Sequence, residues 1–306
     1  MIQQSTIGNG ASESPPLSRI LDGGAKALES KDGKSRIKQA SSRVESGARE
    51  KEMAASGGKL DEDTGGITRP VLIVGFPGTG LVGSICANYI IEKKSLHQIA
   101  FVDSEYIIPA AIYIGGKLRH PFRIYADGKR ALCVIVCEAP LRPEGVYSIM
   151  ELVVTWASRN EVREVLVLDG VPVRGGLPSK DRKPMILSSS SSPSSSSNAS
   201  KDDPIRNAMM MGVSGGLISA CLSDEMPCTG VLIPSTSGIP DPEGAAILLE
   251  TISKMPSVPL EIDVKPLRQE GQAIERQLKE FMDSVGKEQQ EEEGRGRYLR
   301  SSRIYG

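Results

Sequence analysis

The sequence predicts a three-layer α/β/α domain with a mixed, largely parallel sheet, followed by a C-terminal amphipathic helix. Three observations predict this fold. Short aliphatic runs alternate with stretches of helical periodicity, which favours strands joined by crossover helices. The first of these runs, residues 71–74, is continuously apolar, as is typical of a strand buried on both faces. The pair Asp127-Gly128 separates two strand-like runs and indicates one antiparallel hairpin.

The individual elements follow from the same signals, taken in chain order. Helices are indicated by apolar residues at helical spacing, by a wide apolar face in 143–160, by closely spaced small residues in 205–221 and by a cap at Asp241 with Pro242 in the first turn. Strands are indicated by short β-branched runs. We therefore expect strands at 71–74, 98–102, 122–126, 131–137, 164–169 and 229–233, and helices at 81–91, 143–160, 205–221 and 242–252.

The composition divides the chain into four parts. Residues 1–66 carry ten basic and ten acidic residues and no aromatic residue, so we expect this extension to be disordered. Residues 67–262 form the predicted domain, and a serine-rich surface loop at 188–203 interrupts it. Residues 263–293 have a heptad-like apolar spacing, which predicts a helix that packs on the domain or on a neighbouring subunit. Residues 294–306 form a flexible basic tail.

The totals exclude several classes of protein. A net charge of −1 provides no field that would attract nucleic acid or a membrane surface. The apolar runs are far shorter than the roughly 20 residues that a membrane-spanning helix needs, and the first residues do not resemble a signal peptide. We expect a cytoplasmic protein. The five cysteines have no paired short spacings and are expected to be small buried thiols, without a metal or disulfide role.

The turn after the first strand has two interpretations. Residues 78–83 match the pattern G-x-G-x-x-G, and Asp103 follows twenty residues later, as in a dinucleotide-binding turn with its ribose-binding acid. However, the hairpin at Asp127-Gly128 stands where such a fold needs a parallel strand, and the turn lacks a Gly-Lys-Ser/Thr phosphate motif. We therefore favour close packing of strand against helix, and keep a nucleotide- or nucleoside-binding enzyme that uses residues 75–83 as the alternative.

A catalytic group is not apparent elsewhere. Residues 212–216 match the G-x-S-x-G pattern around Ser214, but this elbow needs a preceding strand and a histidine after the serine. Both histidines, His97 and His120, precede Ser214. We predict no catalytic, cofactor-binding or metal-binding residues and expect a protein that is not an enzyme.

Three stretches resemble the proteasome assembly chaperone family, most of all its archaeal members. They are the glycine turn, residues 101–106 and residues 238–242, and the resemblance extends over about 69–285. It implies a phosphorylase-like α/β/α fold and a protein-binding role without a reaction. The turn that the family shares consists of Gly75, Phe76, Pro77, Gly78, Thr79, Gly80 and Gly83. The long N-terminal extension and the serine tract depart from the family's compact form.

The resemblance also gives the C-terminal tail a meaning. Ile304, Tyr305 and Gly306 have the form hydrophobic–tyrosine–any residue, and in several archaeal chaperones of the family such a tail docks between α-subunits of the proteasome core particle. The resemblance therefore implies a homo-oligomeric, non-enzymatic assembly chaperone or adaptor whose partner is the 20S α-ring. A third interpretation is an assembly module that oligomerises without meeting a proteasome.

Overall fold

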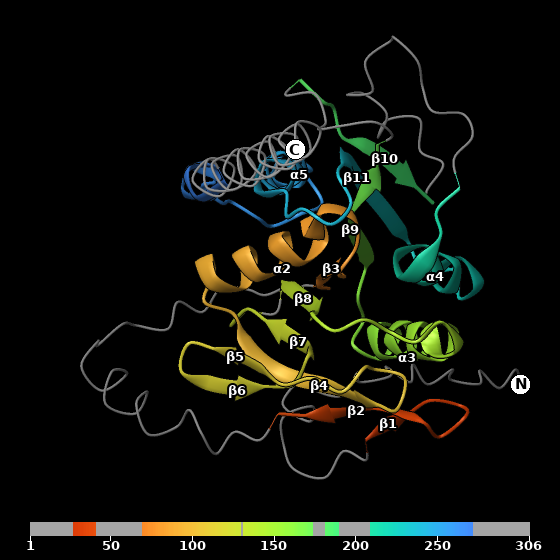
Figure 1. Ribbon diagram of the computed structural model, residues 1–306. Coiled ribbons are helices and arrows are strands. Elements are labelled where there is room, and N and C mark those ends of the chain that lie inside the picture. Colours follow the sequence, from red (N-terminus) through yellow and green to blue (C-terminus); the bar gives the residue numbers. More distant parts are fainter. Residues whose placement is uncertain (1–26, 41–68, 130, 174–180, 190–208, 272–306) are drawn as a thin grey trace, which may run out of the picture.

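A nine-stranded sheet lies between two layers of helices in the computed structural model (Figure 1). The structure describes residues 27–40, 69–129, 131–173, 181–189 and 209–271. Helices α2 (Val82–Lys93) and α5 (Pro242–Ser253) cover one face of the sheet, and α3 (Val146–Arg159) and α4 (Gly212–Ser223) cover the other. The predicted α/β/α layering is confirmed.

The strand order explains which part of the sheet is parallel. From one edge to the other, the strands are β1 (Leu28–Glu29), β2 (Ser35–Gln39), β4 (His97–Ser104), β7 (Phe122–Ala126), β8 (Leu132–Cys137), β3 (Val71–Gly75), β9 (Glu164–Pro172), β11 (Cys228–Ser235) and β10 (Met185–Ser188). The pairs β8–β3, β3–β9 and β9–β11 are parallel, and the other pairs in this sheet are antiparallel. The sheet is mixed, as predicted, but its parallel part is confined to the centre. On both sides of these parallel strands, neighbouring strands run antiparallel.

The central strand β3 is buried on both faces, as its aliphatic run predicts. Leu72 and Val74 belong to the cluster beneath α3 and α4, whereas Val71 and Ile73 belong to the cluster beneath α2 and α5. This alternation is the two-residue period of a strand inside a three-layer domain. The two apolar clusters together form the core.

Two local predictions hold in the structure. Strands β7 and β8 pair antiparallel on either side of the turn at Asp127-Gly128, and the Asp127 carboxylate accepts a hydrogen bond from the Leu132 N–H at 3.1 Å. At the start of α5, the Asp241 side chain accepts a hydrogen bond from the Gly244 N–H at 2.8 Å, with Pro242 in the first turn.

Helix α4 begins later than predicted. It starts at Gly212 rather than near residue 205, and Met211 before it is extended. Gly212 has φ +75°, which is incompatible with a helix continuing through it from residue 209. Residues 205–208 lie outside the described part of the chain. The predicted serine-rich loop also starts later than expected, because Ser188 still pairs with Thr229 as the end of β10.

The expected disorder of residues 1–66 is wrong for residues 27–40. These residues form β1 and β2, and β2 pairs with β4 at the edge of the sheet. Ser35 and Ile37 are buried, while Arg36 between them is exposed. Ile37 is the single large apolar residue of β2. The alternation of apolar and polar residues is therefore too short to indicate a strand within a charged, polar segment. Residues 1–26 and 41–66 lie outside the described residues.

A helix begins at residue 265, close to the predicted start of the C-terminal helix. Leu267 is 4 % exposed and belongs to the cluster beneath α2 and α5. The rest of the predicted helix, the basic tail and residues 190–203 of the serine-rich loop lie outside the described residues. All five cysteines are buried, as expected. No helix in the described ranges is long and apolar enough to cross a bilayer.

A buried ion pair joins β7 to β8 and α2. The Arg123 side chain is 1 % exposed and lies 2.6 Å from Glu138 Oε2. It also donates to the Tyr125 hydroxyl at 2.9 Å and to the His120 carbonyl at 2.6 Å. Glu138 accepts a hydrogen bond from Asn88 of α2 at 3.0 Å. These contacts satisfy a charge that the core would otherwise exclude.

We predict that Glu138→Ala lowers the free energy of unfolding by about 3 kcal/mol, because it leaves the Arg123 guanidinium buried without its anion. The control is Glu105→Ala, which removes the carboxylate of a half-exposed pair with Lys34 and should cost less than about 1 kcal/mol. Urea unfolding followed by circular dichroism measures both. Equal losses of unfolding free energy in the two variants would show that the buried ion pair stabilises the fold no more than the half-exposed pair does.

Candidate functional site

The natural place for a site in this fold is the edge where the parallel strands end. The carboxyl ends of β3, β9 and β11 meet there, and small ligands of α/β proteins usually bind in a crevice at such an edge. The glycine turn leaves β3 at this edge and leads into α2 through a short 3₁₀ turn, Thr79–Leu81. This edge therefore contains the residues that the sequence singled out.

The inner half of the turn is a contact between backbones. A methyl group on Gly75 would lie 2.0 Å from the Gly83 carbonyl oxygen, and one on Gly83 would lie 2.3 Å from the Leu168 carbonyl oxygen of β9. No side chain fits at either position. The first turn of α2 consequently rests directly on the backbones of β3 and β9.

The outer half of the turn packs against polar side chains. A methyl group on Gly78 would lie 2.1 Å from Asp169 Oδ1, and one on Gly80 would lie 2.0 Å from Ser235 Oγ. Gly80 has φ +67°, and the exposed Leu81 after it has φ +50°, so two successive residues are left-handed. Contacts with protein thus account for the glycines that match the dinucleotide-binding pattern.

Asp103 does not lie beside the turn. It is on β4, and the strands β7 and β8 separate β4 from β3. Its carboxylate is 2.7 Å from Lys38 Nζ and 3.5 Å from Arg36 Nε of β2. The hydrogen bond from Lys38 holds the pKa of Asp103 below its ordinary value. The acid that would bind a ribose is therefore paired with β2, because the connection after α2 leads to β4, which two strands separate from β3.

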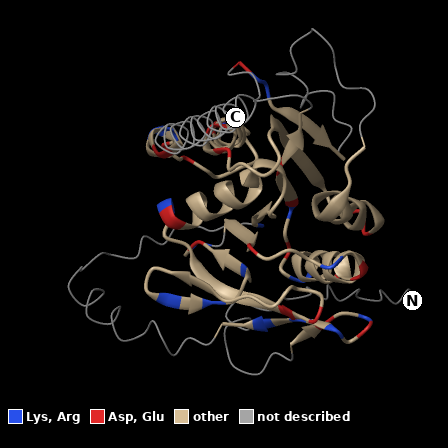
Figure 2. Cartoon of the chain, viewed as in Figure 1, with Lys and Arg blue, Asp and Glu red and all other residues tan. Residues whose placement is uncertain are grey.

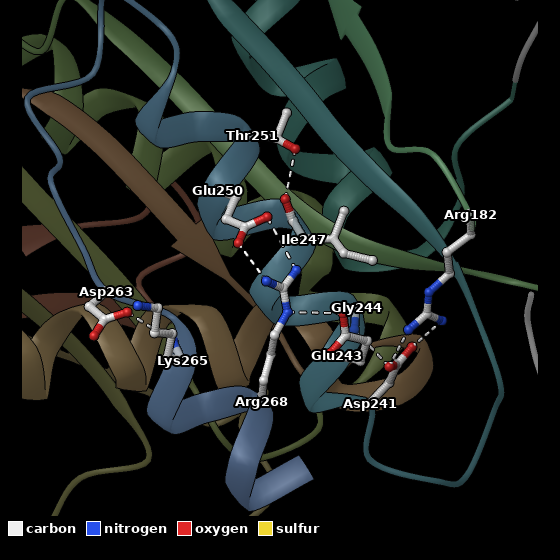
Figure 3. A network of polar contacts seen from close by, with 10 residues as sticks. All are labelled: Arg182, Asp241, Glu243, Gly244, Ile247, Glu250, Thr251, Asp263, Lys265 and Arg268. Carbon is white, nitrogen blue, oxygen red and sulfur yellow. Dashed lines mark hydrogen bonds and ion pairs between the residues drawn. The ribbon is translucent and has the colours of Figure 1, made fainter. Parts of the chain in front are cut away.

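Asp241 is the most connected residue at this edge (Figure 3). Besides capping α5, its carboxylate binds both terminal nitrogens of Arg182 at 2.5 and 2.6 Å. It also accepts a hydrogen bond from Ser235 Oγ at 2.6 Å. Its backbone N–H donates to the Gly80 carbonyl at 2.8 Å. Arg182 is 6 % exposed and also donates to the Pro234 carbonyl at 2.7 Å. Asp241 thereby joins the glycine turn, β11, α5 and the segment before β10.

The sequence identified Asp241 as a helix cap but did not identify Arg182. An arginine in a connection rich in glycine and proline has no local signal for a partner that lies 59 residues later. Only the fold brings the two side chains together.

Asp169 is the second buried carboxylate at this edge. It accepts hydrogen bonds from Ser214 Oγ at 2.6 Å and from the Gly170 N–H at 2.7 Å. Burial raises the pKa of Asp169, although both hydrogen bonds oppose this change. Ser214 lies in the first turn of α4, so its G-x-S-x-G pattern is part of a helix and its hydroxyl donates to a carboxylate. The pattern is not a nucleophile elbow.

The histidines lie away from Ser214. His97 starts β4, and the ring of His120 stacks on Phe101 of β4 with centroids 3.8 Å apart. Within the described ranges, no group of three His, Cys, Asp or Glu side chains is arranged to hold a metal ion. The predicted docking residues Ile304, Tyr305 and Gly306 lie outside the described residues.

The start of the C-terminal helix is tied to α5, which places it on the domain (Figure 3). The Arg268 guanidinium donates to Glu250 at 2.7 and 3.2 Å and to Glu243 at 3.1 Å. The Tyr89 hydroxyl of α2 donates to the Asp263 carbonyl at 2.7 Å just before this helix. Residues 263–271 therefore pack on the same layer as α2 and α5.

We predict that Gly83→Ala lowers the free energy of unfolding by about 1–3 kcal/mol or more, because its methyl group would collide with the Leu168 carbonyl oxygen. The matched control is Gly128→Ala, where no atom lies within 4 Å of the added methyl group, and the change should stay within about 0.5 kcal/mol. Denaturant unfolding compares them. A neutral Gly83→Ala variant would contradict the packing account of the turn.

We predict that Asp169 makes wild-type stability rise relative to Asp169→Asn as the pH falls from neutrality. Its pKa in the folded protein lies above the ordinary value of 3.8, so the folded state binds the proton more tightly than the unfolded state does. This gain in stability should appear as the pH falls from the pKa of Asp169 in the folded protein to its pKa in the unfolded protein. Removing the opposing hydrogen bond with Ser214→Ala should raise this pKa further. Titration of the carboxyl carbon by NMR checks it, and a pKa at or below 3.8 would refute the prediction.

Comparisons with known proteins agree with this architecture. An uncharacterized protein of Methanocaldococcus jannaschii is 26 % identical over 221 residues, which cover 70 % of this chain and 86 % of that protein. A structure of Pyrococcus furiosus PbaA, described as an archaeal homolog of proteasome-assembly chaperone, is 25 % identical with a TM-score of 0.60 and covers 70 % of this chain and 92 % of that chain. Pyrococcus furiosus PbaB, described as an archaeal proteasome activator, shares the fold at 17 % identity with a TM-score of 0.61, covering 81 % of this chain and 99 % of that chain.

The family model that matches this chain covers the glycine turn, the sheet from β3 onward and the start of the C-terminal helix. The match extends over residues 72–282 and carries the description PAC2 family. It confirms the resemblance found in the sequence. The chain belongs to the PAC2 family.

Proposed function

We propose that this protein is a non-enzymatic chaperone or adaptor of proteasome assembly, which acts in the cytoplasm as a homo-oligomer and binds α-subunits of the proteasome core particle. The observation that carries the proposal is the sequence Ile304-Tyr305-Gly306 at the end of a PAC2-family chain. The structural neighbours include a homolog of a proteasome-assembly chaperone and a proteasome activator. We assign a partner of the same kind to this chain.

The chemistry of the tripeptide suits docking into a pocket between two subunits. With Gly306 as the last residue, its carboxylate provides charge-assisted hydrogen bonds to a basic pocket residue. Tyr305 provides ring area and a hydroxyl group, and Ile304 adds apolar contact. Each contact is small, so one tail binds weakly. Several tails on one homo-oligomer would bind a ring of α-subunits with avidity.

The contacts at the edge of the sheet where α/β enzymes bind small ligands support a role without a catalysed reaction. Side chains of β9 and β11 occupy the space beside Gly78 and Gly80, and the Asp241 carboxylate is saturated by Arg182, Ser235 and Gly244. Asp103 is paired with β2. These contacts disfavour the alternative of a nucleotide- or nucleoside-binding enzyme that uses the glycine turn.

We predict that Tyr305→Ala weakens binding to purified 20S core particle by about tenfold or more, because it removes an aromatic anchor of the kind that dominates such interfaces. The matched control is Tyr298→Ala, which removes a tyrosine from the same basic tail outside the terminal tripeptide and should leave affinity unchanged. Surface plasmon resonance with immobilised core particle measures both variants.

Adding one glycine after Gly306 tests the carboxylate separately and should weaken binding as Tyr305→Ala does. Intact mass spectrometry of the protein used confirms that Gly306 is its last residue. Unchanged affinity in the Tyr305→Ala and extended variants would overturn the tail mechanism. A wild-type protein that oligomerises but does not bind the core particle would instead favour a self-assembling module.

A further inference from the structure

A small hairpin lies outside the nine-stranded sheet and packs mainly on itself (Figure 1). Its strands, β5 (Ile112–Ile114) and β6 (Lys117–Arg119), form a two-stranded sheet of their own. Gly115 and Gly116 join them with φ +58° and +76°, as in the two-residue turns that favour tight hairpins. Among the described helices and strands, each of the two has the other as its main neighbour. A hairpin of this size is marginally stable alone, so a further strand or surface beside it would stabilise it.

This hairpin exposes large apolar side chains. Tyr113 and Leu118 stand opposite each other in the register, so they lie on one face of the hairpin, and they are 71 % and 74 % exposed. Ile114 in β5 and Ile108 in the segment that leads into the hairpin are each 45 % exposed. Large apolar side chains that gather on one exposed element mark an interaction surface.

Charge distinguishes the two strands of the hairpin as partners for another strand. Residues 107–116 contain no charged side chain, whereas β6 carries Lys117 and Arg119, and Figure 2 shows basic residues on β6 and none on β5. If β6 paired with β6 of a second copy about a two-fold axis, Lys117 would stand opposite Arg119, and the like charges would repel each other. Lysine is also a common protection of a strand edge against strand addition. The edge of β5 has no such protection.

The composition of the β5 edge indicates a second copy of this chain as its partner. Interfaces that form and dissociate are about as apolar as the rest of a protein surface, whereas the interfaces of permanent homodimers are more apolar. Residues 107–116 consist of isoleucine, alanine, proline, glycine and one tyrosine. Such a stretch lacks the charges by which a different protein would be selected. A two-fold contact brings a surface against itself, and an uncharged strand meets its own copy without repulsion.

We propose that β5 pairs in antiparallel register with β5 of a second copy, which joins two hairpins into one four-stranded sheet. Tyr113 is the middle residue of β5, so the register that pairs all three residues places Tyr113 opposite its own copy and Ile112 opposite Ile114. Strand β6 is tied to its own domain, because the Arg119 guanidinium donates to the Gln98 side chain of β4 at 3.2 Å. The pairing rests on the homo-oligomer of the proposed function and gives that oligomer a defined contact.

A single cysteine tests this register in the full-length protein. Tyr113→Cys places two thiols opposite each other at the two-fold axis, where the Cα atoms of paired residues are about 5 Å apart and within reach of a disulfide. The matched control is Leu118→Cys, an equally exposed position of the same hairpin, whose two copies would be three strand spacings or about 14 Å apart. Under oxidised glutathione, we expect at least about fivefold more covalent dimer from Tyr113→Cys on a non-reducing gel.

Tyr113→Arg tests the same contact without a disulfide. The change removes the central aromatic ring and places two like charges at the axis, so self-association in analytical ultracentrifugation should weaken by about tenfold or more. The matched control is Tyr147→Arg on α3, where the tyrosine is 73 % exposed, and this variant should associate as the wild type does. Circular dichroism confirms that both variants are folded.

Preferential cross-linking of Tyr113→Cys together with weakened association of Tyr113→Arg supports the pairing of β5 with β5. Equal cross-linking of the two cysteine variants overturns it. A wild-type oligomer that Tyr113→Arg leaves intact also overturns it, and the homo-oligomer of the proposed function then forms through another surface. A wild-type protein that stays monomeric overturns both the pairing and the homo-oligomeric state. Binding to the core particle is measured separately with Tyr305→Ala, so a failure of tail docking is distinguishable from each of these results.

Discussion

The close approach of α2 to the backbones of β3 and β9 is the constraint on which the rest of the structure depends. It requires glycine at 75 and 83, because any side chain there meets a carbonyl oxygen. It also brings the Gly80 carbonyl to the Asp241 N–H, and Asp241 in turn caps α5. Arg268 then ties the start of the C-terminal helix to α5. A backbone contact in the centre of the domain is thereby linked to the position of residues 263–271.

This constraint also bears on the proposed function, because it closes the glycine turn around protein groups. The glycines that could cradle a phosphate are occupied in packing strand against helix, and the polar side chains around them bind one another. The features that remain available to partners are the segments outside this joint. The C-terminal tail contains the docking sequence proposed above, which suits a protein that works through other proteins.

Much of the domain could be predicted from the sequence, because its signals are local. The aliphatic run of β3, the Asp127-Gly128 hairpin and the Asp241 cap each need only neighbouring residues, and the structure contains all of them. The failures were long-range. Arg123 is a charged residue within a strand, and its partner Glu138 is identified only when β7 and β8 pair. Strand β2 has one large apolar residue, so its order comes from β4 and not from its own pattern.

The glycine turn is a packed joint, and the proposed function requires that this protein bind other proteins instead of nucleotides. Isothermal titration calorimetry of the full-length chain with ATP, NAD and adenosine tests it most directly. We expect no heat of binding up to about millimolar ligand, the weak end of the affinity scale. Micromolar binding that is lost in Gly80→Val and retained in Gly128→Val would contradict it and assign the turn to a ligand.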